Sequence, residues 1–174
     1  GKKYGTGTII INGGSIDAEG GVYWVSGVTD YQGGAGIGTG TYGIGGTIKI
    51  LGGMITAEGG KNTGAGIGGG TGGGVDTIVI GGANGKAPDI TAYHSALGYL
   101  GAAIGSGWNG VSDLKLSCGD IRILSGSVEV TGGNIGYGVL KVVDGNSMEG
   151  GSVTISEAVK LELPVGSNIK PRGD

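Results

Sequence analysis

The sequence predicts an all-β protein, a right-handed parallel β-helix with about three short strands in each coil. One phrase occurs four times, beginning at Thr8, Thr47, Thr77 and Asp120. Such internal repetition is typical of solenoids, whose units bury their apolar faces against their neighbours. Isoleucine alternates with other residues inside each copy, as it does in half-buried strands. Glycine pairs separate these alternations and supply the corners, since glycine accepts positive φ without steric cost.

The first strand of each copy is predicted from isoleucines two residues apart, because this spacing places both side chains on one face of a strand. We expect these pairs to fill the interior of the tube. The inward pairs are Ile9/Ile11, Ile48/Ile50, Ile78/Ile80 and Ile121/Ile123, and the residues facing outward between them are Ile10, Lys49, Val79 and Arg122.

The second and third strands repeat this alternation after each glycine corner. The second is expected to turn Ile16/Ala18, Ile55/Ala57, Ile90/Ala92 and Val128/Val130 inward. The third is shorter, with Ala35/Ile37, Ala65/Ile67, Ala102/Ile104 and Gly133/Ile135 inward and Gly36, Gly66, Ala103 and Asn134 outward. This outward column has almost no side chains and would let another surface approach the backbone closely, although a tight corner is the simpler explanation.

We expect one module over residues 1–174, with coils at roughly 5–43, 44–73, 74–110 and 111–138. Residues 139–174 are expected to form a last partial coil or a cap, which solenoids need over an open edge. The segment from Leu114 to Leu116 is expected to be an insertion before Asp120 and not an additional first strand. The absence of a signal peptide and the start at Gly1 indicate a piece of a longer protein.

Composition argues against several classes of function. The net charge is −3 and the cationic residues are scattered, which disfavours binding to a nucleic-acid backbone. No apolar run approaches the roughly 20 residues that span a bilayer. Cys118 is the only cysteine and His94 the only histidine, so we expect neither a disulfide framework nor a zinc site. No cofactor is expected.

The connections between the second and third strands predict a binding site. Coil one inserts residues 19–34, coil two only 58–64, and coil three 93–101, and all three loops leave the same edge of the rod. The two longer loops carry aromatic residues and flank the short one, which suggests a notch with aromatic walls and a polar floor. Its expected ligand-binding residues are Tyr23, Trp24, Tyr31, Lys61, Asn62, Tyr93, His94 and Tyr99.

Two classes of partner fit such a notch. A sugar stacks its ring on an aromatic face and meets amide and ammonium groups with its hydroxyls. A host extracellular protein also fits, because Tyr and Trp are the usual interface anchors. The aromatic residues could instead only cover the edge of the tube.

Tyr42 and Trp108, at the opposite corner, could hold a chain-like ligand, but edge packing explains them more simply.

Signals for catalysis are weak. Glu19 and Glu58 occupy equivalent positions in adjacent coils, about 4.8 Å apart if the strands stack. A close carboxylate pair can act on a glycoside or recruit Ca²⁺, but two solvated corner charges are the simpler interpretation. We therefore expect that the chain is not an enzyme.

The repeat resembles a known group of sequences through three of its phrases. Residues 64–70 read Gly-Ala-Gly-Ile-Gly-Gly-Gly, residues 45–50 read Gly-Gly-Thr-Ile-Lys-Ile, and residues 52–57 read Gly-Gly-Met-Ile-Thr-Ala. Over residues 5–138 these phrases resemble the glycine-rich repeats of large surface proteins from anaerobic gut and rumen Firmicutes. The resemblance implies an extracellular, cell-wall-attached or secreted adhesin-like protein, and some surface proteins of this kind capture host proteins, including immunoglobulins.

The architecture is also similar to the non-catalytic pectin-binding β-helices of clostridia, which hold calcium with acidic residues in their coils. The third-strand columns here carry no acidic residue. The expected function is thus a non-catalytic binding or adhesion module for a glycan, with host-protein capture or a passive spacer as alternatives. Self-association is possible in each case, and a carbohydrate-active enzyme is least favoured.

Overall fold

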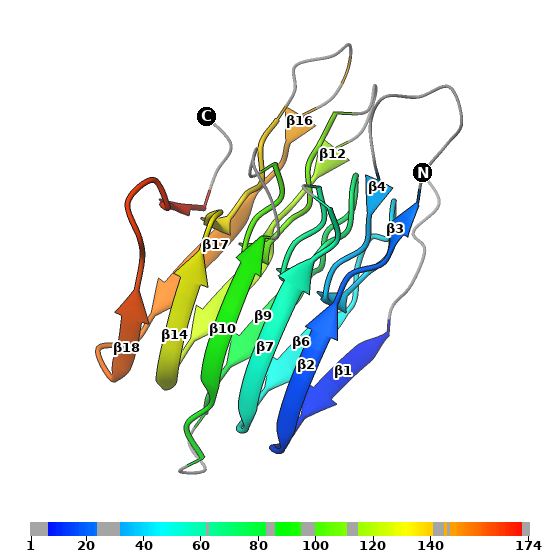
Figure 1. Cartoon of the computed structure of the whole chain (residues 1–174). Helices are drawn as coiled ribbons and strands as arrows, with labels where there is room; N and C mark the ends of the chain where they lie inside the picture. The colour runs from blue at the N-terminus through cyan, green and yellow to red at the C-terminus, as the bar shows by residue number, and fades with distance from the viewer. Residues whose placement is uncertain are drawn as a thin grey trace.

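The computed structural model is a parallel β-solenoid of about four turns, as the repeat predicts. It describes residues 7–23, 32–61, 63–82, 86–94, 100–110, 115–140, 145 and 147–171. All regular elements within these ranges are strands, and they contain no helix that could span a membrane. The strands of successive coils lie side by side along the rod, from β2 at one end to β18 at the other (Figure 1).

Three five-stranded parallel sheets form the walls of the tube. The first sheet contains β1 (Thr8–Ile11), β6 (Thr47–Ile50), β9 (Thr77–Ile80), β13 (Gly119–Ile123) and β17 (Gly151–Ile155). The second contains β2 (Ser15–Glu19), β7 (Met54–Gly59), β10 (Asp89–His94), β14 (Gly126–Thr131) and β18 (Val159–Glu162). The third contains β5 (Ile37–Gly38), β8 (Ile67–Gly68), β11 (Ile104–Gly105), β15 (Ile135–Gly136) and β19 (Ile169–Lys170).

Two small sheets lie outside this pattern. β3 (Val22–Tyr23) and β4 (Gln32–Gly33) form an antiparallel pair within the first long insertion. β12 (Lys115–Leu116) pairs with β16 (Ser147–Met148) and not with the first sheet. The segment before Asp120 is therefore an insertion, and Asp120 pairs directly with Thr77.

Stacked isoleucines fill the tube and confirm the predicted interior of the first two sheets. Ile48 lies between Ile9 and Ile78 in the first sheet, and Ile121 follows Ile78 in the same column. Ile48, Ile78 and Ile121 are all buried. The side chains of such a column repeat at about the 4.8 Å strand spacing, so each coil packs chiefly on its neighbours.

Ala65 and Ala102 are buried as predicted, but the outward direction predicted for Gly36, Gly66 and Ala103 was wrong. Ala103 is fully buried and belongs to the hydrophobic core. A Cβ on Gly66 would meet the carbonyl oxygens of Ala57 and Ala103 at 2.7 and 2.8 Å. The column of Gly36, Gly66 and Ala103 therefore faces the backbone of the second sheet, and glycine or alanine is needed there because the two sheets approach closely.

A second glycine column ends the third strand of each coil. Gly38, Gly68, Gly105 and Gly136 have φ of 146°, 136°, 139° and 120°. A Cβ on any of the first three would lie far inside van der Waals distance of the carbonyl oxygen of the next glycine in the column. Only glycine fits this conformation and this closeness, so the column fixes how tightly successive coils stack.

Replacement of a glycine in this column should destabilise the fold strongly. We expect Gly105→Ala to lower the free energy of unfolding by about 3 kcal/mol, since it combines backbone strain with a clash against the Gly136 carbonyl. Gly21→Ala is a matched control, because a Cβ on Gly21 would meet nothing within 4 Å, and we expect it to change stability by at most about 0.5 kcal/mol. Urea unfolding followed by circular dichroism measures both, and equal midpoints would contradict the role of the column.

Candidate functional site

The most exposed aromatic side chain of the described chain stands on the β3–β4 pair in coil one. Tyr23 is 63% exposed and lies opposite Gln32 in the antiparallel register, beside Val22 opposite Gly33. The Gly34 N–H donates to the Gly21 carbonyl at 2.8 Å and closes the base of the pair. Backbone hydrogen bonds thus hold Tyr23 and Gln32 side by side on the surface.

Two buried threonines fasten this pair to coil two. The Gly33 N–H donates to Thr71 Oγ1 at 2.8 Å and to Thr63 Oγ1 at 2.9 Å. The Thr71 hydroxyl lies 2.7 Å from the Thr63 hydroxyl, and the Thr71 N–H donates to the Gly33 carbonyl at 2.8 Å. Hydrogen bonds among buried groups are costly to break, so we infer that the strand carrying Gln32 has a fixed position relative to the tube.

A hollow of about 360 Å³, hereafter the polar hollow, opens between this pair and the next corner of coil one. Tyr23, Gln32, Thr39 and Thr41 line it, together with backbone groups of Gly21 and Gly34. Val22 and Ala35 also line it. The described side chains around the hollow therefore offer an aromatic ring, two aliphatic groups, an amide and two hydroxyls, and none of them is charged.

Tyr42 lies beside the polar hollow and orients the side-chain amide of Gln32, which lines it. Gln32 Nε2 donates to the Tyr42 hydroxyl at 2.7 Å. Tyr42 is 41% exposed and has φ of 59°, a left-handed conformation that is uncommon for a residue with a side chain. The Gln32 carbonyl oxygen is not engaged by this bond and can accept a hydrogen bond from a ligand.

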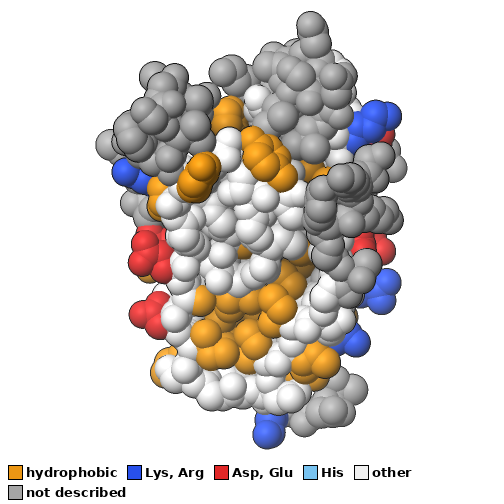
Figure 2. Space-filling model, turned by 90° about the vertical axis from the view of Figure 1, so that its right-hand side faces the viewer, with side chains coloured by type: hydrophobic (Ala, Val, Ile, Leu, Met, Phe, Trp, Pro, Cys, Tyr) orange, Lys and Arg blue, Asp and Glu red, His pale blue; other side chains and the backbone are white. Residues whose placement is uncertain are grey.

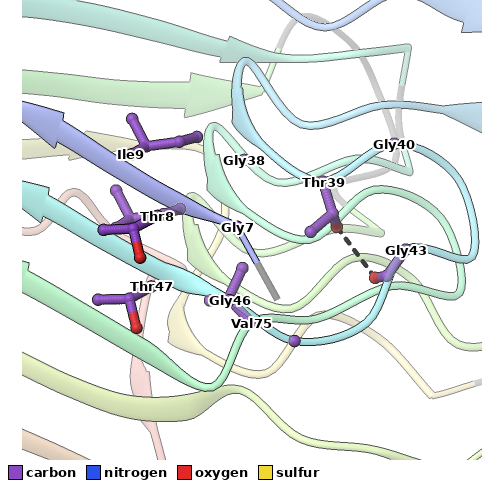
Figure 3. Close-up of a pocket in the computed structure, with 12 residues that line it drawn as sticks. Gly7, Thr8, Ile9, Gly38, Thr39, Gly40, Gly43, Gly46, Thr47 and Val75 are labelled. Atoms are coloured by element: carbon purple, nitrogen blue, oxygen red, sulfur yellow. Dashed lines mark hydrogen bonds between the residues drawn. The ribbon is translucent and has the colours of Figure 1, made fainter. Parts of the chain in front are cut away.

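A second hollow of about 360 Å³, hereafter the apolar hollow, lies at the same end of the rod and shares Gly38, Thr39 and Gly40 with the first. Its apolar lining comes from Ile9, Ile48 and Val75, next to a glycine-rich corner that the Thr39 hydroxyl closes by donating to the Gly43 carbonyl at 3.0 Å (Figure 3). Figure 2 views the rod from this end and shows hydrophobic side chains gathered on it.

The structure brings few of the predicted ligand-binding residues together. Trp24, Tyr31, Asn62 and Tyr99 lie outside the described residues, as does the side chain of His94, the last residue of β10. Lys61 is exposed and Tyr93 is half-buried, and neither lines the polar or the apolar hollow. Tyr23 alone of the predicted set lines a described hollow at this end.

Tyr42 and Trp108 were expected at the corner opposite the notch, but Tyr42 lies against Gln32 of the first insertion, and Trp108 is only 7% exposed. Its backbone accepts a hydrogen bond from Gly72 and donates one to Thr63. This residue packs the edge of the tube, which is the simpler of the two explanations that the sequence allowed.

Tyr93 lies among carboxylates on the outer face of the second sheet. It pairs in register with Glu58, which in turn pairs with Glu19, so the predicted stacking of the two glutamates is confirmed. Burial, a hydrogen bond to Glu58 and the nearby charges of Asp17 and Glu19 raise the pKa of the Tyr93 hydroxyl. The described residues contain no group of three His, Cys, Asp or Glu side chains that could hold a metal ion.

Three residues of the polar hollow, Gln32, Thr39 and Thr41, were missed by reasoning from the sequence, and the link to Tyr42 was missed as well. Gln32 stands in an insertion whose apolar residues show no strand periodicity. Its hydrogen bond to Tyr42 depends on the pairing of β3 with β4. The one usable signal was the concentration of aromatic and polar residues in the longest insertion, which did identify Tyr23.

No protein-family model, curated protein or solved structure matches this chain.

Cys118 carries a thiol that its surroundings keep from reacting. Its side chain is fully buried beside Gly119 and Pro171. Burial raises the pKa of the Cys118 thiol to about 11. The reactive thiolate is therefore scarce at neutral pH, as in structural cysteines.

We expect the native thiol to react with Ellman's reagent at pH 8 at least about 100-fold more slowly than the thiol in urea. At this pH a thiol with a raised pKa is almost wholly protonated, and unfolding restores an ordinary pKa near 8.5. Absorbance at 412 nm measures both rates. Rapid labelling of the folded chain would contradict the buried position of Cys118.

Proposed function

We propose that this chain is a non-catalytic binding module of an extracellular bacterial surface protein, and that it holds a glycan in the polar hollow. The observation that carries the proposal is the exposed ring of Tyr23, held on a short antiparallel pair beside the Gln32 amide. A sugar ring presents C–H groups to an aromatic face and hydroxyls to amides and to other hydroxyls.

The chemistry of the lining supports a neutral sugar. Tyr23 supplies the stacking surface, while Gln32 and Thr41 supply hydrogen-bonding groups around it. The Thr39 hydroxyl is already engaged, because it donates to the Gly43 carbonyl and accepts from the Gly70 N–H. None of the described residues that line the hollow carries a carboxylate, and Glu19 and Glu58 project from the second sheet instead. Hydrolysis of a glycoside needs an acid and a second carboxylate beside the bond to be cleaved, so the lining favours binding without catalysis.

The threonine contacts favour binding by a preformed surface. Because Gly33 is tied to Thr63 and Thr71 in coil two, Gln32 is held in place before a ligand arrives. A ligand then loses less free energy to ordering of the protein, and affinity rises accordingly. The surface location follows from the resemblance of the repeat to cell-surface proteins.

Host-protein capture is the second candidate. Val22, Tyr23 and Tyr42 are 47%, 63% and 41% exposed within the same part of coil one. Exposed aromatic residues next to an apolar side chain are typical anchors of protein interfaces. Such a partner would need to bury roughly 1,200 Å² or more in total.

The glycan proposal is tested on a glycan array with four forms of the full chain. We expect the wild type to retain a neutral glycan, and Tyr23→Ala and Gln32→Ala each to weaken the binding about tenfold or more, equivalent to about 1.4 kcal/mol. Tyr93→Ala removes another tyrosine, outside the polar hollow, and should bind as the wild type does. Equal retention by Tyr23→Ala and the wild type would overturn the site.

A chain that retains no glycan is tested for protein capture. A stoichiometric complex isolated from host serum or mucus, and weakened by Tyr23→Ala but not by Tyr93→Ala, would support the second candidate. Failure of both experiments would leave the chain with the role of a spacer between other parts of a surface protein.

A further inference from the structure

The polar hollow combines apolar and polar side chains in a way that a plain hexose does not fully use. Val22 and Ala35 line it together with Tyr23, Gln32 and Thr41. A hexose offers the C–H faces of its ring and the hydroxyl groups around it. A hydroxyl placed against an aliphatic side chain loses its water without gaining a hydrogen bond, which costs free energy. The two aliphatic residues therefore favour a sugar that carries an apolar substituent of its own.

The Gln32 amide presents its acceptor to the hollow. Its Nε2 donates to the Tyr42 hydroxyl at 2.7 Å, and Tyr42 is not among the residues that line the hollow. This bond orients the amide and does not engage its carbonyl oxygen. Because a carbonyl oxygen accepts hydrogen bonds and cannot donate them, a ligand group that only donates, such as an amide N–H, is its natural partner.

Thr41 offers a donor to the same ligand. The hydroxyl of Thr39 donates to the Gly43 carbonyl and accepts from the Gly70 N–H, so it is already engaged. Thr41 is half-buried and lines the hollow as well. A threonine hydroxyl can donate to a carbonyl oxygen, which makes Thr41 the partner for the acceptor of a ligand amide.

The charge of the lining restricts the ligand further. None of the described side chains around the hollow is ionised at neutral pH. A free amino sugar would bring an ammonium group to a lining without a carboxylate, and a uronic acid would bring a carboxylate to a lining without a cation. Since an unpaired charge is far more costly to desolvate than a neutral polar group, the lining disfavours both classes of sugar.

We propose that the polar hollow selects an N-acetylhexosamine, an inference that rests on the proposed glycan-binding function because it concerns the same site. The sugar ring stacks on Tyr23, the acetamido N–H donates to Gln32 Oε1, and the acetamido carbonyl accepts from the Thr41 hydroxyl. The acetyl methyl packs against Val22 and Ala35. The volume of about 360 Å³ lies near the lower limit of small-molecule sites, about 300 Å³, and so suits a single sugar residue.

The selectivity is measured by isothermal titration calorimetry of the full chain with the methyl glycosides of N-acetylglucosamine, glucosamine and glucose, and of their galacto counterparts. We expect the N-acetyl sugar of at least one series to bind about tenfold or more tightly than the other two members. It alone brings both a methyl group to the aliphatic lining and a neutral N–H to the amide. Equal affinity for the N-acetyl sugar and the hexose in both series would overturn the inference.

Val22→Thr tests the methyl contact with little change of shape. Threonine is also β-branched and suits a strand, but it places a hydroxyl where the acetyl methyl packs. We expect the preference for the N-acetyl sugar over the hexose to fall roughly threefold or more, with the affinity for the hexose unchanged. Val79→Thr makes the same replacement on β9, outside the hollow, and should keep the wild-type preference. A wild-type preference in Val22→Thr would overturn the place assigned to the methyl group.

Gln32→Glu tests the amide. The carboxylate keeps an acceptor at this position and adds a negative charge, which pairs with the ammonium group of the free amino sugar. We expect the preference to shift toward that sugar by about tenfold relative to the wild type. A variant that prefers the N-acetyl sugar as strongly as the wild type does would overturn the role of Gln32.

Failure of this inference differs from failure of the proposed function. A wild type that binds sugars, loses them in Tyr23→Ala and yet does not distinguish the N-acetyl sugar from the hexose would overturn the inference and leave the function in place. A wild type that binds no sugar, or a Tyr23→Ala variant that binds as the wild type does, would overturn both.

Discussion

Contact between successive coils is the constraint on which the rest of this structure depends. Stacked isoleucines exclude water from the tube, and the backbone of each coil donates hydrogen bonds to the next. The glycines at 38, 68, 105 and 136 let the third sheet turn while its carbonyl groups lie nearly against one another. Since each coil relies on its neighbours, stability is a sum of similar interfaces and not the property of one central core.

This arrangement separates the architecture from the binding surface. The columns need only β-branched residues inside and glycine at the corners, so the insertions between strands can vary in length and content. The long insertion of coil one forms the β3–β4 pair. Hydrogen bonds from Gly33 of this pair to the buried hydroxyls of Thr63 and Thr71 join it to coil two. The exposed Tyr23 is therefore supported by two coils although it belongs to one.

The first two sheets were predictable because the alternation of large apolar and polar residues is a local signal. Ile48 and Ile50 are large and apolar whereas Lys49 is charged, so three residues suffice to show which face of the strand points into the tube. The third strand lacks this contrast, since Ala102 and Ala103 are equally small and both are buried. Its orientation depends on the second sheet, which the local sequence does not encode. Likewise, Tyr23 was predictable as an exposed aromatic residue, whereas its meeting with Gln32 and Tyr42 depends on strand pairing.

Lys170 and Pro171 interrupt the glycine column of the third sheet. A globular core limits its own growth because its volume must be filled, but a tube can be lengthened without changing its cross-section. In the last described coil Lys170 stands where the other coils have glycine, and the imide nitrogen of Pro171 has no hydrogen to donate. This rung of the third sheet therefore departs from the pattern that the other coils share.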